Sequence, residues 1–293
     1  MLFPLALTLA SAIPMADLSA LSSFDRLPTL RTGIKFGAVT SYDRTEGNDD
    51  GFSGTYSFVR KEDGNLVLAD LKGPGCITRF HTPTPSGDTL EFYIDGETKP
   101  TLSMPYRDYF TGEHAPFVRP VVEWAAGGAY SYLPIPYQKS CKVLLRAART
   151  QFYDLNFVQY PEGTVVPKFD SKAPTLPTLA NISSAWAQTA QKGPLLVMNG
   201  VTERVAFDKI LAPGKTVTLL DRKKGGRITA MSLSPAFVFQ GRARDTLIRI
   251  TWDGEKQPAV LMPVGDFFGY AFGKPSMRSA LLGSDNGTNY CFL

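Results

Sequence analysis

The densest group of polar side chains lies in residues 41–54, which read SYDRTEGNDDGFSG. Its candidate substrate-binding residues are Asp43, Arg44, Asp49 and Asp50. Carboxylates and a guanidinium at this spacing can hydrogen-bond sugar hydroxyls, and Asp49 and Asp50 could also hold a hard cation through oxygen ligands. The spacing does not follow the D-x-[DN]-x-[DN]-G pattern of a calcium loop, so no metal site is predicted. A solvated turn, or an internal pair between Arg44 and an aspartate, is the structural alternative.

Three charged residues elsewhere are also candidates. Asp285, in GSDNGTN (283–289), is the candidate catalytic carboxylate, because an aspartate can act as a nucleophile. An Asp-Asn-Gly turn is the alternative there, since these residues favour turns. Asp266, in GDFFG, and Arg79, in ITRFHTPTP, are candidate substrate-binding residues. Asp266 could instead hold a turn through backbone N–H groups, and Arg79 could pair with an acid near the site.

Aromatic side chains offer a second way to hold a sugar. Trp124, Tyr130 and Tyr132 could stack on sugar rings, although large aromatics at strand positions are more often part of the core. The two histidines, His81 and His114, are too few and too far apart for a histidine-rich metal site. We predict no cofactor.

Composition limits the classes of function. Hydrophobic residues make up 43% and charged residues 20%, which is ordinary for a globular protein. The net charge of +4 is too small and dispersed to indicate nucleic acid, and no run approaches the roughly 20 apolar residues of a membrane span. The three cysteines show no C-x-x-C spacing, which excludes a cysteine-based zinc motif and leaves the redox compartment open; they are Cys76, Cys141 and Cys291.

The N-terminus reads MLFPLALTLASAIP. A short apolar stretch followed by Ala10-Ser11-Ala12 is typical of a signal peptide with an A-x-A cleavage site, although a basic segment is missing. We therefore expect a secreted or periplasmic protein, with a frayed tail as the alternative.

The chain contains an internal repeat. IDGETKPTLSMPYRDYF (94–110) matches WDGEKQPAVLMPVGDFF (252–268) without a gap at an offset of 158 residues. Upstream, GCIT (75–78) resembles GRIT (226–229) at an offset of 151, so extra residues are expected in AFVFQGRARD (236–245). Features present in both copies are expected to serve the shared fold, and features present once are better candidates for function.

The pattern of elements indicates an all-β protein. Short runs rich in β-branched and aromatic residues are bounded by turn residues, which predicts strands; they lie at 55–59, 66–71, 76–82, 89–95, 142–148 and 152–158, then at 193–199, 215–221, 227–234, 246–253 and 259–265. SSAWAQTAQ (183–191) is the helical candidate, after a Pro-rich stretch. We expect an arm at 1–27, a first β-sandwich at 28–165, a linker with a short helix at 166–194 and a second sandwich at 195–293.

Several long motifs resemble glycoside hydrolase family 172. They are SYDRTEGNDDGFSG (41–54), ADLKGPG (69–75), FYIDGE (92–97), GGAYSYLPIPYQKSCK (127–142), PVGDFFG (263–269) and NYCFL (289–293). The resemblance implies two tandem jelly rolls, assembled as a homotrimer or a pair of trimers. It also implies activity on α-linked fructofuranosides or arabinofuranosides.

The resemblance raises a question about the catalytic pair. A retaining glycosidase needs two carboxyl groups about 5–5.5 Å apart. The family implies two glutamates in the second unit, the first near 283–289, where this sequence has Asp285 and Asn286. The second is expected beyond Leu293, because YSYL (130–133) matches the final YCFL and the first copy continues through Tyr160. On this alignment we expect the second jelly roll to be incomplete.

Two functions remain open on the sequence alone. The first is a retaining glycoside hydrolase acting on an α-furanoside of an oligosaccharide or simpler glycoside. The second is a non-catalytic carbohydrate-binding or structural oligomer, which the unplaced glutamates favour.

Overall fold

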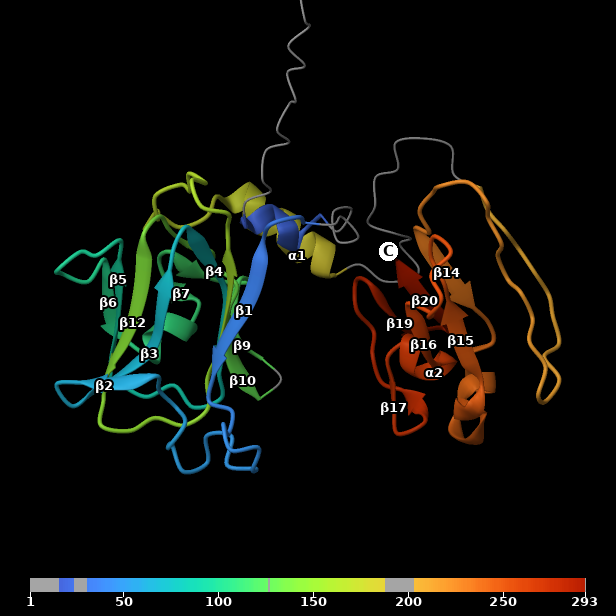
Figure 1. Cartoon of the computed structure of the whole chain (residues 1–293), viewed down its shortest axis with the longest axis horizontal. Coiled ribbons are helices and arrows are strands. Elements are labelled where there is room, and N and C mark those ends of the chain that lie inside the picture. Colours follow the sequence, from blue (N-terminus) through green and yellow to red (C-terminus); the bar gives the residue numbers. More distant parts are fainter. Residues whose placement is uncertain (1–15, 24–30, 126, 188–202, 293) are drawn as a thin grey trace, which may run out of the picture. The chain divides into compact units, whose positions relative to one another are not determined.

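The computed structural model describes residues 16–23, 31–125, 127–187 and 203–292. Its contacts divide the chain into two units, residues 1–21 with 29–183 and residues 22–28 with 184–293. The expected signal peptide and the strand predicted at 193–199 lie outside the described residues. Both units are built mainly of strands, so the predicted all-β class is confirmed (Figure 1).

The first unit contains two antiparallel sheets. Sheet A has the order β1-β13-β4-β10-β9, with β11 also paired to β4. Its strands are β1 (Lys35–Thr40), β4 (Gly75–Thr82), β9 (Val122–Ala125), β10 (Gly128–Ser131), β11 (Ile135–Tyr137) and β13 (Asp154–Gln159). Sheet B has the order β2-β3-β12-β5-β6. Its strands are β2 (Arg60–Glu62), β3 (Asn65–Lys72), β5 (Thr89–Ile94), β6 (Leu102–Pro105) and β12 (Ser140–Arg146).

The chain crosses repeatedly between the two sheets, because β3 lies in sheet B, β4 in sheet A, β5 in sheet B, β10 in sheet A, β12 in sheet B and β13 in sheet A. Each strand presents every second side chain to the space between the sheets, where apolar residues are buried. Fully buried side chains there include Leu66, Phe80, Leu90, Phe92, Val143, Leu145 and Leu155.

An aromatic cluster closes the region around residues 106–117. The 3-10 turn η2 (Asp108–Phe110) buries Tyr109 and Phe110 against Phe80, with ring centroids 5.6 and 5.4 Å apart. The short hairpin of β7 (Glu113–His114) and β8 (Phe117–Val118) follows. These rings bury large apolar areas and fix the turn that carries Asp108.

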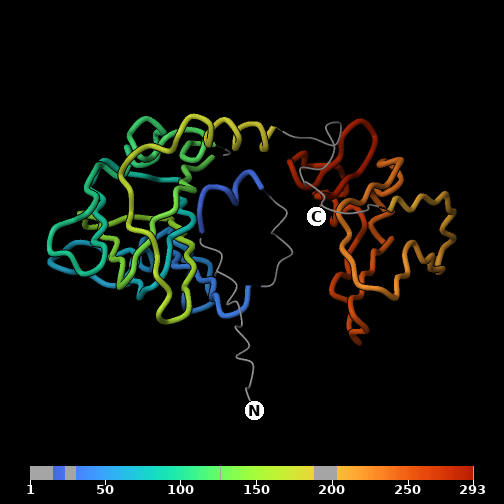
Figure 2. Tube along the Cα trace, turned by 90° about the horizontal axis from the view of Figure 1, so that it is seen from above, coloured from blue at the N-terminus to red at the C-terminus, as the bar shows by residue number. Residues whose placement is uncertain are grey.

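The connection after the first sandwich contains a helix. Helix α1 spans Leu176–Trp186, and a 3-10 turn, η1, spans Leu18–Leu21. Figure 2 follows the chain from the first unit into α1. The helix begins earlier than the predicted residue 183. Thr175 caps it, because its carbonyl oxygen accepts a hydrogen bond from the N–H of Leu179 and its hydroxyl oxygen accepts one from the N–H of Thr178. No helix among the described residues is long and apolar enough to cross a bilayer.

The second unit holds small sheets in its described part. The order β14-β20-β19 joins β14 (Ala230–Leu233), β20 (Thr288–Phe292) and β19 (Leu282–Asp285). The pairs β15 (Leu247–Ile250) with β16 (Val260–Pro263), and β17 (Tyr270–Ala271) with β18 (Lys274–Pro275), flank helix α2 (Val264–Phe267). Its buried core contains Ile248, Val264, Phe268, Tyr270 and Cys291.

Strands that match between the two units pair in the same register. Strands β6 and β16 are 158 residues apart, as the sequence repeat predicts. Tyr130 lies opposite His81 in unit 1, and the matching Tyr290 lies opposite Ser232 in unit 2. The extra residues of the second copy form two 3-10 turns, η4 (Ala236–Phe239) and η5 (Gly241–Asp245), between β14 and β15.

Two strand predictions are wrong. Residues 55–59 form turns before β2, and residues 215–221 form no strand. In the first case Arg44 donates a hydrogen bond to the carbonyl of Tyr56, so this backbone supports a loop and not a strand ladder. In the second, apolar and polar residues alternate as in a strand, but no described strand pairs with that backbone. Alternation describes a half-buried surface and does not by itself supply a pairing partner.

Candidate functional site

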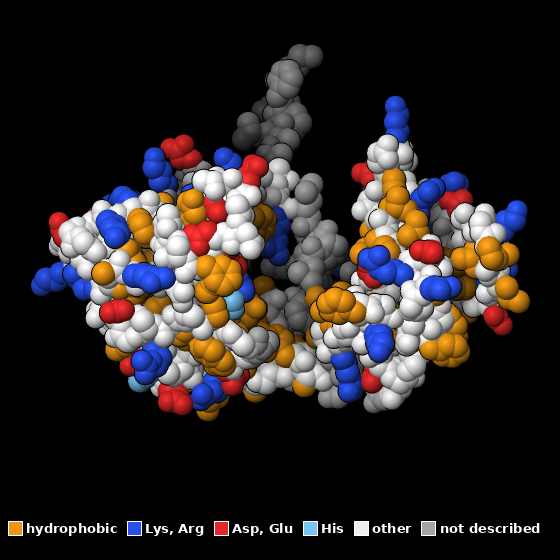
Figure 3. All heavy atoms as spheres, turned by 90° about the horizontal axis from the view of Figure 1, so that it is seen from below, with side chains coloured by type: hydrophobic (Ala, Val, Ile, Leu, Met, Phe, Trp, Pro, Cys, Tyr) orange, Lys and Arg blue, Asp and Glu red, His pale blue; other side chains and the backbone are white. Residues whose placement is uncertain are grey.

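The 41–54 loop leaves sheet A directly at the end of β1. Thr40 lies opposite Asp154, so the loop begins beside the first residue of β13. The ring of Phe52 packs edge-on against Phe152 with centroids 4.9 Å apart, which fixes the far part of the loop to the segment before β13. The loop lies at the lower end of unit 1 in Figure 1, and Figure 3 views the molecule from below, where acidic, basic and hydrophobic side chains are interspersed.

Asp43 is the centre of this loop. Its Oδ1 accepts hydrogen bonds from the N–H and hydroxyl of Thr45, at 2.9 and 2.6 Å, and its Oδ2 accepts one from the N–H of Asp49 at 3.3 Å. The hydrogen bonds from Thr45 hold the pKa of Asp43 below its usual value, because they favour the charged form. Asp43 therefore holds the turn from within.

The two neighbouring aspartates also bond to the loop. Asp49 accepts from the N–H of Ser53 at 2.7 Å through Oδ1 and from the Ser53 hydroxyl through Oδ2. Asp50 accepts from the N–H of Asp43 at 2.8 Å through Oδ1. Within the described ranges, Oδ2 of Asp50 has no hydrogen-bond partner, and Asp50 is exposed. Of the three loop aspartates, Asp50 is thus the most available to a ligand.

Arg44 pairs with carbonyl groups, and not with an aspartate as the structural alternative supposed. Its guanidinium donates to the carbonyls of Thr40, Tyr42 and Tyr56 at 3.1, 3.1 and 2.8 Å. It also lies over the rings of Tyr42 and Tyr56, at 5.0 and 5.7 Å from their centroids. Arg44 therefore ties the start of the loop to the segment before β2.

Arg79 pairs with a strand neighbour on the outer face of sheet A. Its Nη1 lies 2.5 Å from Oδ2 of Asp154 and 3.1 Å from Oδ1 of Asn156. The imidazole of His81 lies two residues further along β4. Burial, together with the nearby Arg79 charge, lowers the pKa of His81, and Asp154 opposes that shift. The predicted pairing of Arg79 with an acid is thus present, at the same end of unit 1 as the 41–54 loop.

The three aromatic candidates do not form one group. The rings of Tyr130 and Tyr132 lie 5.2 Å apart. Trp124 lies opposite Ala129 and is 53% exposed, at the edge strand of sheet A. It lines an open hollow of about 350 Å³ together with Pro83, Pro85, Arg107 and Phe110. Trp124 is therefore exposed, whereas Tyr130 and Tyr132 are half-buried.

Asp266 is the first of two candidate residues in the second unit. It lies in α2, where its carboxylate accepts hydrogen bonds from Arg244 at 2.6 and 3.3 Å. This partner comes from η5, one of the turns that the second copy has in addition. Among the described residues, no backbone N–H group donates a hydrogen bond to the Asp266 side chain as predicted. The guanidinium of Arg244 is its partner instead.

Asp285 ends β19 and precedes a two-residue turn. Asn286 and Gly287 have φ of 46° and 75°, which is the pattern of a type I′ hairpin, so the Asp-Asn-Gly turn is present. The side chain of Asp285 is 8% exposed and lies 3.4 Å from Arg278. Its Oδ2 has no hydrogen-bond partner among the described residues. This Oδ2 is also the oxygen that pairs with Nη2 of Arg278 at 3.4 Å, so its charge is compensated by an ion pair and not by a hydrogen bond.

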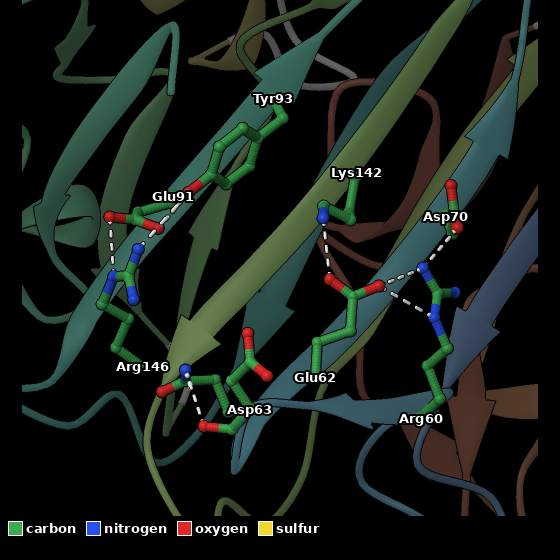
Figure 4. A network of polar contacts seen from close by, with 9 residues as sticks. Arg60, Glu62, Asp63, Asp70, Glu91, Tyr93, Lys142 and Arg146 are labelled. Atoms are coloured by element: carbon green, nitrogen blue, oxygen red, sulfur yellow. Dashed lines mark hydrogen bonds and ion pairs between the residues drawn. The ribbon is translucent and has the colours of Figure 1, made fainter. Parts of the chain in front are cut away.

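The structure also reveals a charged network that the sequence analysis did not single out (Figure 4). On the outer face of sheet B, Glu62 joins Arg60 at 2.6 Å and Lys142 at 2.7 Å, and Arg60 also pairs with Asp70. The alternation of charged and apolar residues along β3 and β12 could have predicted a charged outer face on these strands.

The same face carries a buried carboxylate. Glu91 accepts hydrogen bonds from Arg146 and from the Tyr93 hydroxyl, both at 2.8 Å, and its side chain is 7% exposed. Burial raises the pKa of Glu91, but these hydrogen bonds outweigh it and leave the pKa below its usual value. Because both partners come from the same sheet, this network serves the fold of sheet B.

No group of three or more histidine, cysteine, aspartate or glutamate side chains within the described ranges is placed to hold a metal ion. The three cysteines are buried free thiols. Polar chemistry in the described parts therefore lies in carboxylates, guanidinium groups, tyrosines and one half-buried histidine.

A first β-sandwich unit, followed by a second β-rich unit that repeats part of its sequence, defines a modular all-β protein. Comparison with family descriptions agrees with that class. Residues 32–175 match the GH172 first beta-sandwich domain, and residues 202–293 match the GH172 domain-like family. The chain belongs to glycoside hydrolase family 172. A search of curated proteins found no match.

Proposed function

We propose that this protein is a retaining glycoside hydrolase acting on α-linked furanosides, of the D-fructofuranosyl or D-arabinofuranosyl type. The observation that carries the proposal is the family match across both units, which supports a glycoside hydrolase. The choice of α-furanoside comes from the motif resemblance. A retaining reaction requires one carboxylate to attack the anomeric carbon and a carboxylic acid to protonate the leaving oxygen.

Asp285 is the described residue that we propose for one of these carboxylates. Its side chain is nearly buried, and its Oδ2 is ion-paired with Arg278 at 3.4 Å without accepting a hydrogen bond within the described part. An aspartate carboxylate can act as the nucleophile of such a reaction. Asp266 is the weaker choice, because Arg244 already holds its carboxylate at 2.6 Å.

The test is hydrolysis by the full-length product of the reading frame that encodes this chain. Its substrates are p-nitrophenyl α-D-arabinofuranoside and an aryl α-D-fructofuranoside, beside a panel of other aryl glycosides. Asp285→Asn should abolish turnover while leaving the melting temperature close to that of the parent. Failure to hydrolyse either furanoside, while other glycosides in the panel react, would overturn the proposal.

A non-catalytic carbohydrate-binding role is the second candidate. The observation favouring it is that Asp43 and Asp49 accept hydrogen bonds from their own loop through both carboxylate oxygens. A loop held this way is suited to a preformed binding surface. Saturable binding of the same glycosides without turnover of any substrate in the panel would support this role over hydrolysis.

A further inference from the structure

Four side chains on sheet A form a row across four strands. Asp154 lies opposite His81, His81 opposite Tyr130, and Tyr130 opposite Glu123. Directly opposite residues of antiparallel strands point to the same face, so all four side chains share the outer face of the sheet. At the usual strand spacing the row extends over about 14 Å. We call these four residues the sheet A row.

The charges at both ends of the row are compensated. Arg79 lies 2.5 Å from Asp154, and Arg119 lies 3.4 Å from Glu123. A charged ligand would have to displace one of these pairs or lie beside its like charge. The row therefore favours a ligand that is polar but uncharged.

The middle of the row is open for hydrogen bonding. His81 and Tyr130 are half-buried, and within the described ranges neither the imidazole nor the phenol hydroxyl has a hydrogen-bond partner. The space for the imidazole comes from Gly128, where an added Cβ would lie 2.4 Å from Nε2 of His81. The ring of Tyr132 lies beside that of Tyr130, with the ring centroids 5.2 Å apart.

Equivalent tyrosines elsewhere in the molecule are satisfied internally. In the second unit Tyr290 occupies the place of Tyr130, between Ser232 and Gly283, and its hydroxyl donates to the carbonyl of Ser279 at 2.6 Å. On the outer face of sheet B, the Tyr93 hydroxyl donates to Glu91 at 2.8 Å. The repeat thus keeps the strand scaffold in both copies, while the histidine, the glutamate and an available tyrosine hydroxyl occur only in the first.

We propose that the sheet A row is a carbohydrate-binding subsite for an uncharged furanosyl unit. The Tyr130 hydroxyl and the His81 imidazole hydrogen-bond sugar hydroxyls. The neutral charge balance and the two available polar groups together fit a sugar better than an ion or an apolar ligand. The sugar class rests on the proposed function; the location of the subsite rests on the geometry.

The experiment measures binding of methyl α-D-arabinofuranoside and methyl α-D-fructofuranoside by NMR titration of the full chain. Tyr130→Phe removes one hydroxyl and should weaken binding of the preferred glycoside roughly 2- to 12-fold, the range for losing one neutral hydrogen bond. Tyr93→Phe is the matched control, a tyrosine on the other outer face, and should leave the affinity unchanged. Gly128→Ala displaces the imidazole and should weaken binding without touching a polar group.

Unchanged affinity in a folded Tyr130→Phe variant, or no binding of either glycoside to the parent chain, would overturn the subsite. A loss of affinity in Tyr93→Phe equal to that in Tyr130→Phe would also overturn it, because the effect would then not be local. Binding that depends on Tyr130 without any hydrolysis would reject the proposed hydrolase function and retain the subsite. Hydrolysis together with binding that does not depend on Tyr130 would retain the proposed hydrolase function and reject the subsite.

Discussion

Replacing Asp49 or Asp50 by asparagine removes one negative charge from the 41–54 loop with little change in the shape of the side chain. The asparagine at 49 can still accept from the Ser53 N–H through its oxygen, while its amide donates to the Ser53 hydroxyl. At 50 the oxygen can still accept from the N–H of Asp43. Asp50 also has a φ of 39°, which asparagine tolerates better than most residues. Both variants should keep the fold of the loop.

The expected magnitudes follow from these contacts. Exchanging a charged for a neutral hydrogen bond costs about 1 kcal/mol, or about 2–4 °C in melting temperature for a unit of this size. A carboxylate that hydrogen-bonds a sugar contributes more, about 1.5–3 kcal/mol, which is roughly a 10- to 150-fold change in kcat/KM. We expect the larger loss for Asp50→Asn, because Oδ2 of Asp50 has no other partner among the described residues.

The assay pairs kcat/KM on an aryl α-furanoside with the melting temperature of each variant. Asp43→Asn is the contrasting change, because its new amide would face the N–H of Asp49 and loosen the loop. It should lower stability as well as turnover. A fall in melting temperature of Asp49→Asn or Asp50→Asn with unchanged turnover of the folded fraction would show that the loop is only structural.

Three further outcomes are expected. Burial raises the pKa of Cys76 to about 12, that of Cys291 to about 11 and that of Cys141 still further, so Ellman's reagent should react with these thiols only on unfolding; rapid reaction of the native protein would contradict their burial. Phe272 is fully exposed at a φ of 53°, so Phe272→Asn should stabilise the second unit by about 1 kcal/mol in chemical denaturation, and destabilisation would indicate that the ring has a partner. Because the pKa of Asp43 is lowered on folding, its contribution is present above about pH 4 and is lost as the pH falls through the folded pKa; Asp43→Asn should therefore flatten the acid limb of stability against pH, and an unchanged limb would contradict this.

Much of the fold was predictable because it depends on local patterns. Strands β3, β4 and β5 coincide with short apolar runs bounded by turn residues, and the sequence repeat predicted the correspondence of β6 with β16. The Asp-Gly pairs at 95–96 and 253–254 adopt positive φ in both copies, which fits a shared structural role. The repeat could not show which sheet each strand joins, since that depends on pairing between distant residues.

The site was less predictable for the same reason. Sequence reasoning selected Arg79 and the 41–54 loop, but it could not place Asp154 beside Arg79, because the two residues meet only when β4 pairs with β13. It also considered His81 only as a metal ligand. The availability of His81 depends on Gly128, a residue 47 positions away that gives its imidazole room. Contacts across strands, and not residue type, distinguish the available groups from those already bonded.

The stereochemistry of the first product tests the proposed activity most directly. Proton NMR during hydrolysis of p-nitrophenyl α-D-arabinofuranoside or an aryl α-D-fructofuranoside, by the full-length product of the reading frame, distinguishes the anomer released from the one formed later by mutarotation. A retaining α-furanosidase releases the α-anomer first, and Asp285→Asn should abolish that signal in a folded protein. First release of the β-anomer, or unaltered turnover by Asp285→Asn, would contradict the proposed mechanism.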